Sequence, residues 1–155
     1  MKELVLYPNS ILLKECEEVK LPLSKEDETL INDMYAYLKE NDTAVGLAAP
    51  QMGVAKRMIV IRHKDANGDT FNCKMVNPRI ISKSSKTYFV PDGEACLSEP
   101  GIKVEVPRHK EILLYGYDTI KKAYVSYKLI NFRAAIAQHE VDHLNGVLLH
   151  SYKKD

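Results

Sequence analysis

The sequence lacks any long apolar run. No stretch of its 155 residues approaches the roughly 20 consecutive apolar residues that a transmembrane helix requires. The first eight residues include Lys2 and Glu3 and have no extended apolar core of the kind found in secretory signals. We therefore expect a cytoplasmic protein that has no membrane partner.

An excess of charge of one sign is also missing. The chain has 22 Lys and Arg residues against 21 Asp and Glu residues, and its formal net charge is +1 at pH 7. A nucleic-acid-binding surface needs clustered basic side chains. The short basic runs Lys121-Lys122 and Lys153-Lys154 are typical of a solvated surface and of a tail. The sequence therefore indicates no nucleic-acid partner.

Cysteine is scarce, with residues only at Cys16, Cys73 and Cys96. An odd number of cysteines in a compartment that keeps thiols reduced argues against a disulfide framework. Hydrophobic residues make up 45% of the chain, and no internal repeat or low-complexity tract interrupts it. This length can bury most of its apolar surface without disulfides, so we expect one domain over residues 1–155.

The most informative segment that is present is His139-Glu140-Val141-Asp142-His143. On an α-helix the two histidines lie about 40° apart around the axis and about 6 Å apart along it, so one cation can bind a nitrogen from each. The HExxH spacing supplies two metal ligands and, in Glu140, a general base for a water molecule. The same pentapeptide also occurs in exposed helices, where its residues are ordinary polar side chains.

The residues before this pentapeptide favour a buried helix. Phe132, Ala135 and Ile136 stand seven, four and three positions before the first histidine and continue its face as an apolar stripe. Such a stripe is typical of core packing, and it is equally compatible with the wall of a cleft. Gly146 predicts that the helix ends one turn beyond the second histidine.

The third metal ligand must come from elsewhere in the chain. Cys96 is the best candidate, because it lies between turn-forming residues at 91–93 and 100–101. Cys16 lies in a charged segment, and Cys73 falls in a predicted strand, where a buried structural thiol is the simpler interpretation. The sequence alone leaves these alternatives open. A thiolate, two neutral imidazoles and water would leave one positive charge on a divalent site and acidify the water.

Residues 44–53 combine small and apolar side chains with one polar residue, Gln51. The small residues let the backbone pass close either to a ligand or to a packed helix. The amide of Gln51 could stabilise a developing oxyanion, or it could be hydrogen-bonded to the backbone of its own loop.

The remaining patterns predict an α+β fold. Ser24 begins a helix over residues 25–40, a strand is expected at 58–62, and Asn67-Gly68 predicts a two-residue hairpin turn. Strands in the middle and the metal-binding helix at the end favour segregated elements over alternating βαβ units. Further strands are expected near 70–76, 79–83, 86–90, 102–106, 111–117 and 123–128.

Three segments together resemble the signature motifs of peptide deformylases, the metalloenzymes that remove the N-formyl group from nascent bacterial polypeptides. The segments are Val45–Gln51, Glu94–Ser98 and Gln138–His143, and they occur in the order of the family's motifs. The resemblance implies an α+β fold in which antiparallel or mixed sheets wrap around a central C-terminal helix that carries the HExxH motif.

The resemblance also implies a role for individual residues. The metal ligands would be Cys96, His139 and His143, the acid/base would be Glu140, and the oxyanion donors would be Gln51 and the backbone N–H of Leu97. The methionine side chain of the substrate would occupy a pocket formed by Val45, Gly46, Phe132, Ala135 and Ile136.

The same resemblance extends to the cofactor and the partners. One divalent ion is expected, with Fe²⁺ as the ion in cells and Zn²⁺, Ni²⁺ or Co²⁺ as alternatives. The expected partners are N-formylmethionyl nascent peptides met at the ribosome, and the protein is expected to be a monomer.

Two residues depart from the usual family pattern. Ala95 and Ala44 stand where most members carry glycine, and each methyl group lies beside a backbone that should approach the substrate. Substrate range or rate would therefore differ from that of other members.

Three further expectations concern residues outside the motifs. Glu94 and Arg108 are expected to form an ion pair that supports the metal loop. Asp142 is expected to be a supporting or surface-pairing group. The remaining histidines are expected at the surface or at strand ends, without a chemical role: His63, His109 and His150.

Two other functions remain open at this level. The HExxH motif is typical of zinc peptidases, which are the first alternative. Such enzymes generally take their third metal ligand from residues downstream of the motif, and only 12 residues follow His143. A divergent paralogue with altered or lost deformylase activity is the second alternative. Glu140 and Gln51 argue against it, because neither residue is needed to hold a metal.

Overall fold

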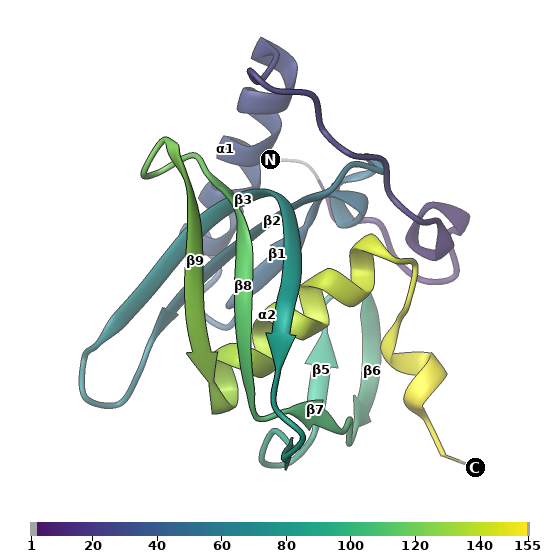
Figure 1. Cartoon of the computed structure of the whole chain (residues 1–155). Coiled ribbons are helices and arrows are strands. Elements are labelled where there is room, and N and C mark those ends of the chain that lie inside the picture. Colours follow the sequence, from purple (N-terminus) through teal and green to yellow (C-terminus); the bar gives the residue numbers. More distant parts are fainter. Residues whose placement is uncertain (1–2, 155) are drawn as a thin grey trace.

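A five-stranded antiparallel sheet with a helix on each face forms the centre of the molecule (Figure 1). The computed structural model describes residues 3–154. The five-stranded sheet has the strand order β1-β2-β3-β8-β9. Two further sheets of two strands each are formed by β4-β7 and by β5-β6. The elements are η1 (Ser10–Leu13), α1 (Lys25–Glu40), β1 (Gly46–Ala48), η2 (Ala49–Met52), β2 (Met58–Lys64), β3 (Thr70–Lys83), β4 (Thr87–Tyr88), β5 (Glu94–Cys96), β6 (Glu99–Val104), β7 (Arg108–His109), β8 (Glu111–Asp118), β9 (Ala123–Ile130), α2 (Asn131–Leu144) and η3 (Leu149–Tyr152).

The helix α1 forms where the sequence predicts it. The hydroxyl of Ser24 accepts a hydrogen bond from the backbone N–H of Asp27 at 3.1 Å, which caps the first turn. The apolar face of α1 packs on one face of the sheet, against Met58 and Val60 of β2. Each large aliphatic side chain buried there contributes about 1.5–3 kcal/mol.

The helix α2 packs on the opposite face of the sheet. Ile59 and Ile61 alternate with the β2 residues that face α1, and they join one core cluster with Ile136 and Leu144 of α2. Successive side chains of a strand point to opposite faces, so β2 is buried on both sides. The predicted fold class, α+β with a C-terminal helix that bears the HExxH segment, is confirmed.

Several local expectations differ from the structure. Asn67 and Gly68 do lie in a hairpin, but the connection comprises residues 65–69, because the side chain of Asp65 accepts hydrogen bonds from the backbone of Asn67 and Asp69. The two strands expected at 70–76 and 79–83 form one long strand, β3, whose register with β8 shifts between Val76 and Arg79.

The β5-β6 hairpin stands apart from the five-stranded sheet (Figure 1). Its strands pair Glu94 with Val104 and Cys96 with Glu99. No strand of the large sheet is hydrogen-bonded to it, so contacts with other segments must hold this hairpin against the rest of the molecule. Neither helix α1 nor α2 combines the length and the apolar character that a membrane span requires.

A glycine ends α2 and lets the chain near the N-terminus approach it. The helix stops at Leu144, earlier than the expected full turn beyond His143, and Gly146 follows with φ +72°. The N–H of Val147 bonds to the carbonyl of Asp142, and the N–H of Gly146 bonds to that of His143, which is a Schellman arrangement. A Cβ at Gly146 would lie 2.5 Å from the carbonyl oxygen of Leu13.

Replacing Gly146 by alanine should therefore destabilise the protein by more than about 2 kcal/mol, since a left-handed backbone costs about 1–2 kcal/mol and the collision adds to it. Urea denaturation measures the free energy of unfolding. Gly68→Ala is the matched control, because Gly68 has φ +84° and its Cβ would meet only Lys64 at 3.9 Å. Equal losses in the two variants would show that the approach of Leu13 is unimportant.

Candidate metal centre

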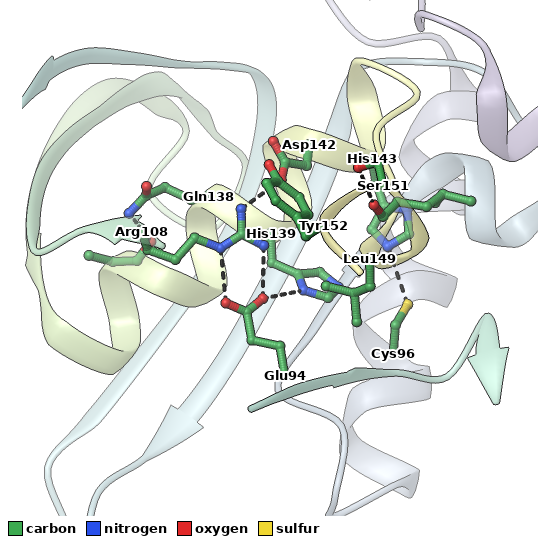
Figure 2. A network of polar contacts seen from close by, with 12 residues as sticks. Glu94, Cys96, Arg108, Gln138, His139, Asp142, His143, Leu149, Ser151 and Tyr152 are labelled. Carbon is green, nitrogen blue, oxygen red and sulfur yellow. Dashed lines mark hydrogen bonds and ion pairs between the residues drawn. The ribbon is translucent and has the colours of Figure 1, made fainter. Parts of the chain in front are cut away.

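Cys96 of β5 lies close to the two histidines of α2, and of the three residues His143 is buried while Cys96 and His139 are half-buried. The ligand atoms of Cys96, His139 and His143 all lie within 4.8 Å of one another. The Cys96 Sγ lies 3.4 Å from the Nε2 of His143 (Figure 2), and the two imidazole centroids are 5.2 Å apart. One thiol and two imidazoles at this separation form a donor set suited to a divalent transition metal.

The other two cysteines do not join this group. Cys73 is fully buried in β3, and burial raises the pKa of its thiol. Cys16 is buried beside the end of α2, where its backbone N–H donates to the carbonyl of Leu144. The expectation that Cys73 is a buried structural thiol is confirmed.

A buried carboxylate orients the first histidine. Glu94 accepts hydrogen bonds from the Nε and Nη2 atoms of Arg108 at 2.9 and 2.8 Å, and its Oε1 lies 3.0 Å from the Nδ1 of His139 (Figure 2). The expected ion pair between Glu94 and Arg108 is therefore confirmed. Burial raises the pKa of Glu94, but the hydrogen bonds from His139 and Arg108 outweigh that effect and lower it.

The network continues from Arg108 to the far side of α2. The Nη1 of Arg108 donates to Asp142 at 2.6 Å, and the hydroxyl of Tyr152 donates to the same carboxylate oxygen at 2.8 Å (Figure 2). Asp142 is thus the pairing group that the sequence predicted. A carboxylate that fixes the second nitrogen of a metal-binding histidine sets its tautomer and its orientation.

Two observations fit these residues to a metal ion. Burial lowers the pKa of His143, whereas hydrogen bonds to Cys96 and Glu94 raise the pKa of His139 despite its burial. A metal ligand must be the neutral imidazole, so the direction of the shift fits His143 alone. The Oε1 of Glu140, in the residue next to His139, is also buried without a hydrogen-bond partner among residues 3–154. Buried polar atoms normally have partners, so this oxygen fits a site that holds a further group.

Glu140 lies between the metal-binding histidines and strand β1. Its carboxyl group is buried, and burial raises its pKa to about 7. A Cβ at Gly46 would lie 2.6 Å from the Oε2 of Glu140 and 3.0 Å from the Cγ2 of Ile136. The absence of a side chain at position 46 therefore lets α2, with the Glu140 carboxylate, pack closely against β1. Close packing against a helix is thus one reason for the small residues in segment 44–53.

Gln51 reaches the centre from η2. Its Oε1 accepts a hydrogen bond from the backbone N–H of Ala48 at 3.0 Å, and its Nε2 donates to the Ser98 hydroxyl at 3.1 Å and to the Cys96 Sγ at 3.8 Å. The two interpretations of Gln51 are therefore compatible, because the oxygen holds the loop while the N–H₂ group points toward the thiol. Leu97 follows Cys96 and has a partly exposed side chain.

An open cavity of about 520 Å³ lies beside these groups. Gln51, Cys96, His139 and Glu140 contribute to its wall, which otherwise consists mainly of apolar residues. All the residues expected in a substrate pocket line it, namely Val45, Gly46, Phe132, Ala135 and Ile136, and so do Ala44, Ala95 and Leu97.

Sequence reasoning missed the contact between Glu99 and His150. Glu99 is a buried carboxylate of β6, and the half-exposed His150 contacts it through Nδ1. No local sequence pattern predicts this pair, since 51 positions separate the two residues. His109 and His63 lie at or next to the ends of β7 and β2, as expected.

Comparison with known proteins places this arrangement in a family. The family described as polypeptide deformylase matches residues 1–155. The peptide deformylase of Macrococcus caseolyticus is 39% identical over 98% of this chain and 89% of its own length. A probable peptide deformylase from Synechococcus phage S-SSM7 superposes with a TM-score of 0.86 at 33% identity, covering 99% and 100% of the two chains. The Met-Ala-Ser-bound class I type b peptide deformylase of Acinetobacter baumannii superposes with a TM-score of 0.85 at 29% identity, covering 99% and 98%.

We expect Glu94→Gln to weaken binding of a divalent ion by about 10–100-fold, because the substitution loosens the group that orients His139. Competition between the protein and a chromophoric chelator for Co²⁺ measures the affinity. Glu18→Gln removes the same charge from an exposed position and should leave the affinity unchanged. An unaltered affinity in Glu94→Gln would exclude an orienting role for this carboxylate.

Proposed function

The chain belongs to the polypeptide deformylase family, and from that premise we propose how its residues divide the work of the reaction. As a peptide deformylase it removes the formyl group from the N-terminal N-formylmethionine of newly made polypeptides and releases formate. We assign Cys96, His139 and His143 as the metal ligands. The observation that carries this assignment is the convergence of one thiol and two imidazoles beside the buried carboxyl of Glu140.

The family implies a divalent metal, and the Cys/His/His group could bind it. When bound, such an ion supplies a Lewis acid that polarises a carbonyl oxygen and lowers the pKa of water. We propose Fe²⁺ as the ion in cells, as the family resemblance implies. The mixed sulfur and nitrogen donors also suit Zn²⁺, Ni²⁺ and Co²⁺.

Glu140 is proposed as the group that moves the proton. Its carboxylate lies in the wall of the cleft next to the ligands, where it accepts a proton from the attacking water and returns it to the amine that leaves. The water oxygen bonds to the formyl carbon, the carbon–nitrogen bond breaks, and formate and a free amino terminus result. The strand at Gly46 holds Glu140 from the opposite side.

Gln51 and Leu97 are proposed to stabilise the charge that develops on the formyl oxygen. The Nε2 of Gln51 already points to the region of Cys96, and Leu97 follows that cysteine in the cleft wall. Preorganised N–H donors of this kind act where the charge appears and need no rearrangement during the reaction.

The apolar wall of the cleft is proposed to bind the methionine side chain. Val45, Gly46, Phe132, Ala135 and Ile136 line it, and burial of an unbranched thioether against such residues is favourable. The Acinetobacter baumannii enzyme, which binds Met-Ala-Ser, supports this proposal because it shares the fold along nearly the whole chain. Ala44 and Ala95 add methyl groups to the same wall.

We further propose that residues 1–155 act as one catalytic domain, as a monomer in the cytoplasm, and that the enzyme meets nascent peptides at the ribosome. Support for a monomer comes from the cleft, to which one chain contributes the thiol, the imidazoles, the carboxyl group and the apolar wall. The remaining parts of this proposal rest on the family resemblance.

Formate release from a formyl-Met peptide by protein purified without oxygen tests the function. We expect turnover by the wild type and a loss of at least about a hundredfold in kcat for Glu140→Gln, because general acid–base catalysis typically contributes that much. The amide retains the size of the side chain, so metal content should stay the same. Near wild-type turnover by Glu140→Gln would exclude Glu140 as the base. Cleavage of unformylated peptides by the wild-type protein would instead favour a zinc peptidase.

Ala135→Phe should fill part of the methionine pocket. KM for formyl-Met peptides should rise by about tenfold or more, because a buried methionine side chain contributes roughly 1.5–3 kcal/mol of binding, while metal content remains that of the wild type. Ala137→Ser is the control on the same helix, since Ala137 is buried in the core cluster and does not line the cleft. Equal KM values for wild type and Ala135→Phe would exclude this pocket.

A further inference from the structure

The hairpin that carries Cys96 needs an anchor on both sides of that residue. The β5-β6 sheet is not hydrogen-bonded to the five-stranded sheet, so the position of the thiol depends on contacts between the hairpin and other segments. Glu94, two residues before Cys96, provides one anchor through Arg108 and His139. The residue that pairs with Cys96 across the hairpin is Glu99, whose side chain is only 1% exposed.

Glu99 binds the C-terminal turn η3 with both carboxylate oxygens. Its Oε1 accepts from the backbone N–H of Leu149 at 2.8 Å, and its Oε2 accepts from the backbone N–H of His150 at 2.9 Å. The Nδ1 of His150 contacts the same Oε2. A carboxylate this deeply buried is stable only when such donors surround it.

The turn η3 is in turn attached to the helix that bears the histidines. The hydroxyl of Tyr152 donates to Asp142, and the guanidinium of Arg108 lies over the Tyr152 ring at 5.3 Å. Figure 2 shows Tyr152 beside Asp142 and Arg108. The turn η3 therefore connects the β5-β6 hairpin, which carries Cys96, to α2, which carries His139 and His143.

The segment near the N-terminus contacts both the η3 turn and the β5-β6 hairpin. The ring of Tyr7 stacks on the ring of His150 with centroids 4.0 Å apart, and the backbone N–H of Tyr7 donates to the carbonyl of Ser98 at 2.8 Å. Ser98 lies between Cys96 and Glu99, and its hydroxyl accepts a hydrogen bond from Gln51. Both ends of the chain thus hold one short hairpin.

We propose that Glu99 is a positioning residue, which holds the Cys96 thiolate at the distance from His139 and His143 that metal binding requires. It acts by tying β6 to η3, and η3 to α2 through Tyr152 and Asp142. The inference rests on the proposed function of Cys96 as a ligand. It assigns to the last residues of the chain a part in building the metal centre.

The chemistry of the contact explains why a carboxylate occupies this position. The N–H groups of Leu149 and His150 are fixed donors, and each meets its own oxygen of Glu99. A glutamine of the same size has one acceptor oxygen and one N–H₂ group. Glu99→Gln therefore sets a donor against a backbone donor, and η3 must move away from β6.

The test uses the full-length protein loaded with Co²⁺, in Glu99→Gln and wild type. Absorption from thiolate-to-Co²⁺ charge transfer reports the Cys96 bond, and transfer of Co²⁺ to a chelator reports its release, both well below the melting temperature. We expect a weaker band and a release rate at least tenfold faster in Glu99→Gln, in line with the 10–100-fold effects of residues that orient ligands.

Two controls separate positioning from general destabilisation. Glu105→Gln removes the same charge from an exposed site just after β6. Ile31→Val or Ile31→Ala weakens the core under α1, and the one that matches the melting temperature of Glu99→Gln is used. Wild-type release rates in both controls support the proposal. Release as fast from the Ile31 variant as from Glu99→Gln overturns it.

A further variant covers the case in which Glu99→Gln does not fold. His150→Ala removes the ring that contacts Glu99 and stacks on Tyr7, but it keeps both backbone donors. It should release Co²⁺ about two- to threefold faster, and an unchanged rate would count against the proposal. Absence of the thiolate band from the wild type itself would instead refute the ligand assignment of Cys96, and this inference with it.

Discussion

The buried ion pair between Glu94 and Arg108 is the contact on which the arrangement of Cys96, His139 and His143 depends. Both side chains are almost fully buried, with exposed fractions of 6% and 4%, so each charge requires the other. The net gain in stability from such a pair is small compared with apolar burial, but removing one partner is costly because the other is left unpaired. Its value here is geometric. Glu94 comes from the hairpin that carries Cys96 and contacts His139 directly, so the pair fixes β5 and α2 relative to each other.

Residues on the two sides of α2 make different kinds of contact. His139, Glu140 and the second histidine lie at the metal centre and its cleft, whereas Gln138 and Asp142 point to the other side. Gln138 accepts from the backbone N–H of His109 and donates to its carbonyl, which docks β7 on the helix. One short segment of α2 therefore contributes two histidines to the Cys/His/His group and also the residues that hold the helix in place. Its hydrogen bonds reach β5, β7 and η3.

Periodic and local signals predicted most of the fold. The capping residue Ser24 and the apolar spacing after it predicted the bounds of α1. The strands expected at 58–62, 111–117 and 123–128 correspond to β2, β8 and β9. The strand β1 was missed, because Gly46–Ala48 is too short and too small to show alternation. Likewise, the sequence could not show that β3 continues through its register shift near Val76, because that depends on pairing with β8.

By itself the sequence determined the spacing of His139 and His143, because an α-helix converts a fixed separation in sequence into a fixed separation in space. It also determined the family, through three short motifs in order. Only the tertiary structure showed that Cys96 lies beside the two histidines and that Glu99 is bound to the C-terminal turn. These contacts join residues about 50 positions apart, and nothing in their local sequence specifies a partner. The packing of α2 against the sheet brings them together, and that packing is a property of the whole chain.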